Sequence, residues 1–246
     1  RHLEAAMPEG CRKTVIDDHD ALERDGIVIR AFPGFHYDAG TTHGVPETGY
    51  LVETGAHRIL MPADVRDYGG RLPDMGHVTH LFNAQTGLNH RDPGVAGAGL
   101  IDPRVSCELI ADTFHIHPAL FSLVARMKGD KMVLITDCTR AGGLADGEYT
   151  LGGQPIFVRG IECRLADGTI AGSVLKMNEA IRNMRAHTSL PLNEIVNMAS
   201  LNPAKRIGIA DRKGSIEPGK DADFAFADEN MNITRTILRG RTIFQA

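Results

Sequence analysis

In the stretch Thr79-His80-Leu81-Phe82-Asn83-Ala84, a histidine ends an apolar run and an asparagine follows three residues later. The same construction recurs twice downstream, where residues 105–110 lead to His115 and residues 131–135 lead to Asp137. Three successive apolar segments therefore end in His, His and Asp, which are residue types that bind metals and move protons. Because α/β barrels build active sites from side chains at the carboxyl ends of strands, the pattern predicts such a site here.

The middle of the chain, residues 78–210, alternates between expected strands and helices, which predicts a mostly parallel sheet. Apolar spacing and helix-end signals predict helices at 118–127, 175–187 and 192–199. A further helix is expected to begin at Pro203, with Asn202 as its N-cap. Residues 146–172 are broken by Asp-Gly and Gly-Gly pairs, which indicates a β-hairpin insertion after a barrel strand.

The two ends of the chain follow other patterns. Residues 17–24 are expected to open a helix with Asp at its N-terminus, and residues 26–29 are expected to form the next strand. The tail from Gly214 begins with a turn cluster, and three short strands are expected after it, at 224–226, 233–238 and 242–244. Three strands are few for an independent sheet, so we expect the tail to add to strands supplied elsewhere.

Bulk composition excludes several classes of protein. The 246 residues are 42% hydrophobic and 24% charged with a net charge of −4, which excludes a general nucleic-acid or anionic-membrane binder. No apolar run approaches the roughly 20 residues that span a bilayer. The four cysteines are far apart and form no CxxC pair, which argues against a zinc ribbon or disulfide scaffold and predicts a cytoplasmic protein. The chain opens at Arg1 without an initiating Met or a signal peptide, and we expect it to be a fragment.

From His77 onward, the chain resembles the N-acetylglucosamine-6-phosphate deacetylase family of the amidohydrolase superfamily. The motifs that carry the resemblance occur in the family's order: His77-Val-Thr-His-Leu-Phe-Asn-Ala84, Arg91-Asp-Pro-Gly94, Ile110-Ala-Asp-Thr-Phe-His115, Leu134-Ile-Thr-Asp137, Ala171-Gly-Ser173 and Ser200-Leu-Asn-Pro-Ala204. Residues 214–223 are similar to the return strands of the superfamily's small β domain. The resemblance implies a (β/α)8 TIM-type barrel over residues 1–212, incomplete or divergent at its front. Residues 213–246 would be the C-terminal strands of a small β-sandwich domain.

The resemblance also implies a chemistry, the metal-assisted hydrolysis of the N-acetyl amide of N-acetylglucosamine 6-phosphate. One divalent metal ion would activate water and polarise the carbonyl, and histidine and carboxylate ligands suit zinc, iron, cobalt or manganese. Asp137 matches the catalytic acid/base, and His80 matches a metal ligand. His115 matches a histidine that contacts the substrate near its carbonyl. The positions that match the sugar-phosphate site are Asn83, Ala84 and Arg91.

Two further metal ligands of the family, a glutamate and a second histidine, have only partial counterparts. Glu4 follows His-Leu as in the family but lacks the Gly-Pro that should come after it. His57 is preferred over His36, because the spacing from His57 to His80 suits one helix and one strand. Residues 62–65 then look like the start of that helix.

Alternatives stay open at this point. His115 and His117 form an HxH pair that would share a metal on a strand, although Pro118 indicates that a helix begins there and favours a surface position for His117. The chain could be a catalytically incomplete remnant that keeps a sugar-phosphate pocket. It could also be an amidohydrolase for a cyclic amide or another acetamido sugar. The resemblance implies a homodimer, with a small sugar phosphate as substrate and neither nucleic acid nor membrane as partner.

Overall fold

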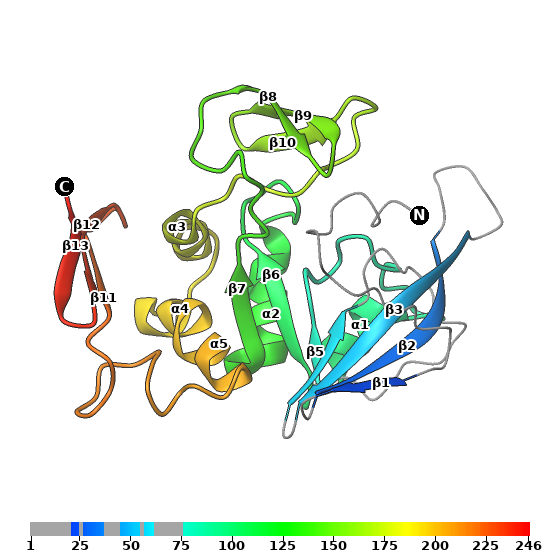
Figure 1. The fold of residues 1–246 in the computed structure, drawn as a ribbon, viewed down its shortest axis with the longest axis horizontal. Helices are drawn as coiled ribbons and strands as arrows, with labels where there is room; N and C mark the ends of the chain where they lie inside the picture. Colours follow the sequence, from blue (N-terminus) through cyan, green and yellow to red (C-terminus); the bar gives the residue numbers. More distant parts are fainter. Residues whose placement is uncertain (1–20, 25–26, 37–44, 55–56, 62–75) are drawn as a thin grey trace.

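The computed structural model describes residues 21–24, 27–36, 45–54, 57–61 and 76–246, with side chains from residue 76 onward. Its main sheet contains seven strands in chain order: β1 (Ala21–Arg24), β2 (Ile27–His36), β3 (Val45–Thr54), β4 (His57–Met61), β5 (His77–Val78), β6 (Ser106–Ile110) and β7 (Met132–Ile135). Strands β1 to β4 pair antiparallel, whereas β4 to β7 pair parallel (Figure 1). The parallel half therefore presents the carboxyl ends of β4 to β7 at one edge.

In the described part of the chain, five α-helices accompany the parallel half: α1 (Gly94–Ile101), α2 (Ala119–Lys128), α3 (Met177–His187), α4 (Leu192–Ala199) and α5 (Leu201–Arg206). The apolar faces of α1 to α4 pack on the sheet and form one buried core with it, which includes Leu109, Leu134, Phe121, Met184 and Ile195. Strand β6 reads Ser-Cys-Glu-Leu-Ile with four of its five residues buried, as expected for a parallel strand covered on both faces. Among the described helices, none combines the length and apolar character that crossing a bilayer requires.

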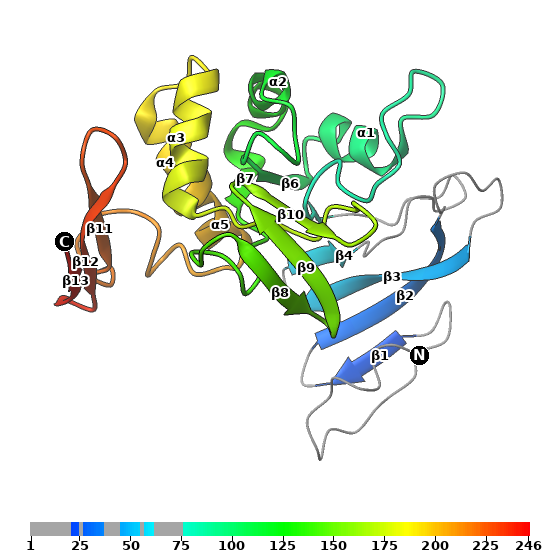
Figure 2. The ribbon, with the colours of Figure 1, turned by 90° about the horizontal axis from the view of Figure 1, so that it is seen from above.

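An antiparallel insertion follows β7. It consists of β8 (Gly147–Leu151), β9 (Gln154–Arg159) and β10 (Glu162–Leu165), and it has its own small core around Ile156, Val158 and Cys163. Seen from above, this insertion lies over the carboxyl ends of the parallel strands (Figure 2). The chain then returns to the barrel side, where Ser173 forms a parallel bridge with Cys138 and so continues the sheet beyond β7.

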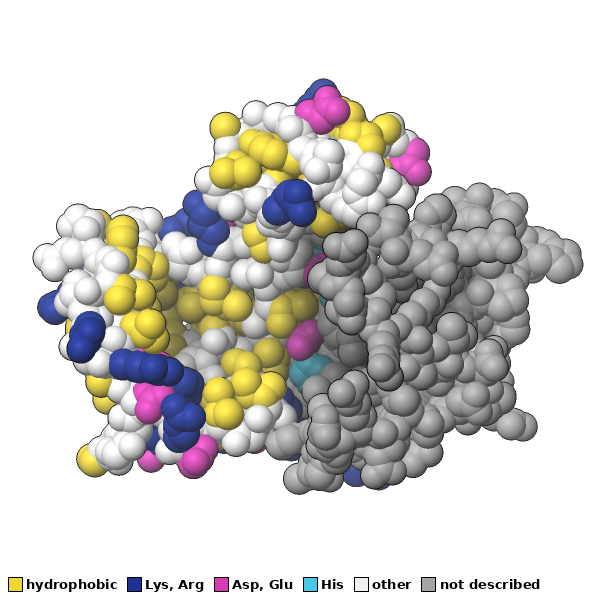
Figure 3. Space-filling model, in the orientation of Figure 1, with side chains coloured by type: hydrophobic (Ala, Val, Ile, Leu, Met, Phe, Trp, Pro, Cys, Tyr) yellow, Lys and Arg dark blue, Asp and Glu magenta, His cyan; other side chains and the backbone are white. Residues whose placement is uncertain are grey.

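The tail forms a separate three-stranded antiparallel sheet of β11 (Phe224–Ala227), β12 (Ile233–Leu238) and β13 (Arg241–Gln245). Four large apolar side chains of this sheet are exposed, namely Phe226, Leu238, Ile243 and Phe244. Apolar atoms accordingly gather over this part of the surface in Figure 3. An exposed apolar face of this kind suits packing by another element or chain.

Most expectations for the middle of the chain are confirmed, including the helices at 118–127, 175–187 and 192–199 and the insertion at 146–172. The barrel is shown in part, as parallel strands β4 to β7 with α1 and α2 as crossovers between β5, β6 and β7. The expected helix at 17–24 is wrong over 21–24, because these residues pair with β2 as strand β1. In the tail, the three strands pair with one another within the described part of the chain.

The expected N-cap of α5 is also wrong. Ser200 occupies that position, and Asn202 lies inside the helix. Asn202 is buried, and its side-chain amide donates a 2.8 Å hydrogen bond to the carbonyl of Met132 at the start of β7. The side chain therefore ties α5 to the sheet, which is a tertiary contact that local helix signals do not reveal.

Candidate active site

The predicted side chains His80, His115 and Asp137 follow β5, β6 and β7 respectively. These strands are hydrogen-bonded neighbours and parallel, so the three residues come to the same edge of the sheet. Histidine and acidic atoms are visible near the centre of the molecular face in Figure 3. The expectation that successive strand ends converge is therefore confirmed at the level of the backbone.

Backbone strain marks the same three strand ends. Seven described non-glycine residues have a positive φ, and five of them lie here: His80 (31°), Phe82 (76°), Ala84 (49°), Thr113 (69°) and Asp137 (49°). Positive φ is unfavourable for residues with a Cβ atom, and surrounding contacts must hold each of them in place. Such strain concentrates at functional sites, where it fixes side chains in orientations that relaxed backbone does not allow.

The turn after β5 holds His80 by its ring and its main chain. Nδ1 of His80 lies 3.2 Å from the carbonyl oxygen of Asn83, and the Asn83 N–H donates back to the His80 carbonyl. Gln85 closes the turn, because its buried amide donates to the Thr79 carbonyl and accepts from the Phe82 N–H. With its proton on Nδ1, the imidazole keeps the Nε2 lone pair for a ligand, as in metal-binding histidines held by a backbone carbonyl.

A polar cluster of His77, Thr79 and Glu108 lies between β5 and β6. Nε2 of His77 is 2.7 Å from Oε1 of Glu108, and the Thr79 hydroxyl donates a 2.6 Å hydrogen bond to Oε2. Burial acts to raise the pKa of Glu108, but hydrogen bonds from His77 and Thr79 and the nearby imidazoles of His77 and His80 outweigh burial. The pKa of Glu108 is therefore held below its usual value.

His115 forms a buried pair with Asp112, a residue that the sequence analysis missed. Nδ1 of His115 lies 2.5 Å from Oδ2 of Asp112, and both side chains are 3% exposed. Oδ1 of Asp112 accepts the backbone N–H groups of Phe114 and His115, which closes the loop after β6. The position of Asp112 directly after the apolar run of β6 is the signal that could have identified it, since His80 and Asp137 were found by the same rule.

The insertion reaches the loop that carries His115. The guanidinium of Arg164, from β10, lies 4.8 Å from the ring centre of Phe114, and Phe114 makes an edge contact with the ring of His115. His117 is exposed, and its Nδ1 accepts the Ala119 N–H at the start of α2. The structure therefore supports a helix-start role for His117. Its ring binds the first turn of α2, whereas the ring of His115 binds Asp112.

The residues matched to the sugar phosphate lie between β5 and α1. Asn83 and Ala84 are half-buried in the turn after His80, and Arg91 is exposed in the following loop. The Arg91 N–H is bound by the Asn89 side chain, which shapes the loop and leaves the guanidinium at the surface. Gly94 begins α1 with φ +59°, and a Cβ there would lie 2.7 Å from the Thr86 carbonyl oxygen, so only glycine fits.

Asp137 is exposed at the end of β7. Its carbonyl accepts the Ser173 N–H at 3.0 Å, and the Ser173 hydroxyl donates to the Thr136 carbonyl, so the next barrel segment holds the strand end. Among the described residues, no hydrogen bond engages the Asp137 carboxylate. A main chain fixed by Ser173 and a carboxylate that is left to bind a reacting group suit a proton-transfer role.

The structure describes the backbone of only one of the two remaining metal-ligand candidates, His57. Glu4 lies outside the described residues. His57 opens β4, and Leu60 of that strand pairs with Val78, which places His57 toward the amino ends of the strands and His80 beyond the carboxyl end. The side chain of His57 is outside the description. Within the described residues, no group of three or more His, Cys, Asp or Glu side chains could hold a metal ion.

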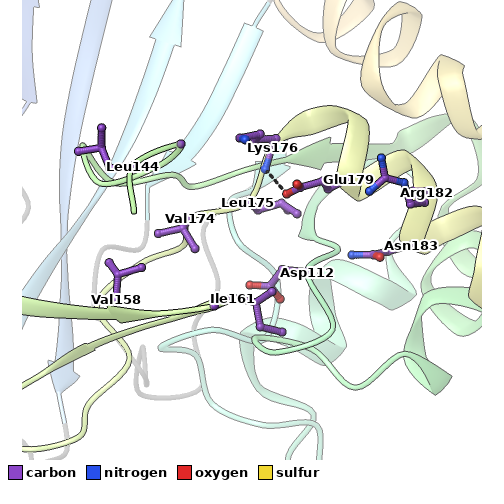
Figure 4. A pocket seen from close by; sticks show the side chains of 12 residues that line it. Asp112, Leu144, Val158, Ile161, Val174, Leu175, Lys176, Glu179, Arg182 and Asn183 are labelled. Atoms are coloured by element: carbon purple, nitrogen blue, oxygen red, sulfur yellow. Dashed lines mark hydrogen bonds between the residues drawn. The ribbon is translucent and has the colours of Figure 1, made fainter. Parts of the chain in front are cut away.

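A cavity of about 370 Å³ lies beside the His115 loop (Figure 4). Asp112 forms one part of its wall, and Ile161 of the insertion points toward Asp112. Apolar side chains of Leu144, Val158 and Val174 line one side, and polar side chains from α3 line the other. Among these, Glu179 accepts the Lys176 N–H at 3.2 Å, which fixes the first turn of α3.

Comparison with known proteins identifies the family. Residues 66–243 match the Amidohydrolase family. The chain belongs to this family. The N-acetylglucosamine-6-phosphate deacetylase of Bacillus subtilis is 48% identical over 169 residues, which are 68% of this chain and 43% of that protein. A protein of Escherichia coli K12 named putative N-acetylgalactosamine-6-phosphate deacetylase is 42% identical over 66% of this chain and 97% of its own length.

A solved structure agrees with this family assignment. The N-acetylglucosamine-6-phosphate deacetylase of Thermotoga maritima has a TM-score of 0.67 and 36% identity, with 70% of this amidohydrolase chain and 48% of that chain covered. The chain thus spans less than half the length of this protein and of the Bacillus relative.

Proposed function

We propose that this amidohydrolase removes the N-acetyl group of N-acetylglucosamine 6-phosphate, releasing glucosamine 6-phosphate and acetate. The observation that carries the proposal is the arrangement of His80, His115 and Asp137 at the carboxyl ends of three adjacent parallel strands. Support also comes from the Bacillus and Thermotoga relatives, whose names state this activity.

The proposed chemistry assigns proton transfer to Asp137. Its carboxylate takes a proton from the attacking water, and the resulting hydroxide adds to the amide carbonyl. Asp137 then gives the proton to the amine nitrogen as the C–N bond breaks, so that acetate and a free amine leave. An exposed carboxylate on a backbone held by Ser173 is suited to both steps.

His115 is proposed to stabilise the oxyanion that forms in the tetrahedral intermediate. Asp112 binds Nδ1 of His115, which fixes the orientation of the ring and leaves Nε2 for the substrate. Donation from Nε2 to the developing oxyanion would then act in a site where the pair is almost fully buried. Electrostatic interactions are stronger there than in water.

Members of the amidohydrolase family generally use a divalent metal ion, and we propose one such ion here, zinc, iron, cobalt or manganese. When bound, it lowers the pKa of a water molecule and polarises the amide carbonyl. Nε2 of His80 is suited to hold it, because Nδ1 is engaged by the Asn83 carbonyl. The described side chains do not complete a metal site, so the other ligands would come from elsewhere, with Glu4 as a candidate. The position of His57 at the amino end of β4 counts against it as a second ligand of an ion held by His80.

Further parts of the proposal concern binding and organisation. The side-chain amide of Asn83, the N–H group of Ala84 and the guanidinium of Arg91 would hold the phosphate, because the three residues follow one another from the His80 turn into the loop before α1. A homodimer and a cytoplasmic location are proposed from the resemblance and the cysteine spacing. A boundary after residue 212 is supported by the self-paired sheet of β11 to β13.

A second substrate, N-acetylgalactosamine 6-phosphate, is favoured by the Escherichia coli relatives that carry its name. The two sugars differ only in the configuration of one ring hydroxyl, and Arg91 would contact the phosphate that they share. Comparison of kcat/KM for the two sugars distinguishes the candidates. A preference of tenfold or more, about 1.4 kcal/mol, would identify the substrate.

The deciding experiment is elemental analysis of the purified chain beside an amine-release assay with both sugar phosphates. Roughly one metal ion per chain with turnover would support the deacetylase proposal. A folded chain without metal or turnover, even after zinc or iron is added, would reject catalysis by this chain. Binding of the sugar phosphate in that sample would then favour the remnant alternative.

A further inference from the structure

Glu108 contacts the residues on both sides of His80. Its Oε2 accepts a 2.6 Å hydrogen bond from the hydroxyl of Thr79, the residue before His80. Its main-chain carbonyl accepts a 2.8 Å hydrogen bond from the N–H of Leu81, the residue after His80. A single residue of β6 thus holds the end of β5 at two points.

His80 needs such support because its backbone is strained. Its φ of 31° lies in the left-handed region, where a residue with a Cβ persists only if its surroundings impose the conformation. The strain directs the ring so that Nδ1 meets the Asn83 carbonyl at 3.2 Å. Loss of either Glu108 contact would release one side of the strained residue.

The carboxylate of Glu108 is also held in position by His77. Its second oxygen lies 2.7 Å from Nε2 of His77, whose side chain is 10% exposed, against 22% for Glu108 itself. A half-buried carboxylate without partners would be costly, so His77 and Thr79 together make the position of Glu108 tenable. The contact with His77 therefore holds the Glu108 carboxylate where it can accept the hydrogen bond from Thr79.

We propose that Glu108 is a positioning residue for His80, which fixes the imidazole in one tautomer and orientation with Nε2 available to a ligand. The inference deepens the proposed function, since it rests on His80 as the residue that faces the metal. Hydrogen-bond partners of metal-binding histidines commonly affect metal affinity by about 10- to 100-fold. Glu108 does not contact the ring of His80 directly. It would act on the ring through Thr79 and Leu81, the residues before and after His80.

A purely structural role for the cluster of His77, Thr79 and Glu108 predicts a different result. In that case, substitutions of Glu108 or Thr79 would lower the stability of the fold without changing the state of the His80 ring. The proton position on the ring is thus the deciding readout. Two-dimensional proton–nitrogen NMR of the histidine rings in the full, metal-free chain reports it directly, and the His80 signals are assigned by their loss in His80→Gln.

Two pairs of variants separate hydrogen bonding from charge and size. Thr79→Val removes the hydroxyl at nearly constant volume, and Thr79→Ser restores it. Glu108→Ala removes the side-chain contacts, whereas Glu108→Gln keeps an acceptor for Thr79 and a donor for His77. Asn202→Ala is the matched control, because it removes a buried hydrogen bond to Met132, at the start of β7, and leaves residues 79–81 untouched.

The wild-type ring is expected to show one tautomer with the proton on Nδ1. Thr79→Val and Glu108→Ala should give averaged or broadened ring signals, while Thr79→Ser, Glu108→Gln and Asn202→Ala should keep the wild-type signals. An averaged ring in the wild-type chain would overturn the proposal. So would unchanged signals in the Val and Ala variants, or equal disturbance by Gln and Ala at position 108.

Zinc affinity, measured by competition with a chromophoric chelator, adds a second readout. Thr79→Val should weaken zinc binding by about 10-fold relative to Thr79→Ser, the lower end of the effect of such partners. A wild-type chain that binds no zinc would count against the proposed metal role of His80. The NMR result would still decide the positioning role, because it is read without metal.

Discussion

Oδ2 of Asp112 lies 2.5 Å from Nδ1 of His115, and the two side chains are each 3% exposed. The other oxygen of Asp112 binds the N–H groups of Phe114 and His115. One carboxylate therefore fixes the ring of His115 and the backbone that carries it. This double role makes Asp112 the most informative position for testing the proposed part of His115.

Replacement of Asp112 by Asn should lower kcat by about 100-fold with a smaller effect on KM, because the amide places an N–H group opposite Nδ1 and favours the wrong tautomer. The amide oxygen still accepts the two backbone N–H groups, so the loop should keep its fold. Steady-state kinetics with the sugar phosphate measure the effect, and Asp130→Asn, an exposed carboxylate after α2, is the control. An unchanged kcat in Asp112→Asn would remove His115 from the chemistry.

Asp137 can be tested by its effect on a neighbour. Burial raises the pKa of the Cys138 thiol, and the negative charges of Asp137 and Glu179 add to the increase. Asp137→Asn removes one of those charges, so the pKa of Cys138 should fall and more thiolate should form at pH 8. Alkylation of Cys138 by iodoacetamide should then be faster than in the wild type, as followed by mass spectrometry.

The same variant should lose turnover by about 10²- to 10⁴-fold, the usual contribution of a general acid/base. Cys107 is the internal control, because burial raises its pKa to about 11 and the thiol is fully covered. Cys107 should stay unlabelled in both proteins. Full turnover in Asp137→Asn with faster labelling of Cys138 would show that the carboxylate is charged but not catalytic.

The proposed site was largely predictable from the sequence, because the signal for each residue lies in the sequence next to it. His80, His115 and Asp137 each end an apolar run, and parallel strands bring such ends together whatever the rest of the fold does. Asp112 also follows an apolar run and could have been identified by the same rule, but its contact with the ring of His115 is a pairing that a linear pattern does not reveal. The pairing of residues 21–24 with β2 and the burial of Asn202 also depend on partners that are distant in sequence.

Arg91 is predicted to recognise the phosphate and no other part of the substrate. Arg91→Met should raise KM for N-acetylglucosamine 6-phosphate by about 10- to 100-fold, since a charged hydrogen bond contributes about 1.5–3 kcal/mol. The unphosphorylated sugar, assayed at high concentration, should be processed equally by both proteins. Arg126→Met, which removes an exposed arginine from α2, is the control. Equal losses for both sugars would exclude a phosphate contact.

The tail sheet is held to α3 by hydrogen bonds from one face of that helix. Arg182 donates from Nε to the Asn230 carbonyl at 2.9 Å and from Nη2 to the Asn232 side chain at 3.1 Å. Arg185 donates to the Glu229 carbonyl at 2.7 Å. All three acceptors lie in the turn between β11 and β12, so this turn is the point at which the sheet is attached.

Arg182→Met should therefore loosen the tail sheet while the barrel strands keep their stability. The loss of two hydrogen bonds, at about 0.5–1.5 kcal/mol each, predicts a local cost of about 1–3 kcal/mol. Hydrogen exchange should become roughly 5- to 150-fold faster for amides of β11 to β13 if they exchange by local opening, and should be unchanged in β5 to β7. Uniform acceleration in both regions would mean that the tail sheet and the barrel unfold together, because α3 also donates from Asn183 to the Ala111 carbonyl beside Asp112.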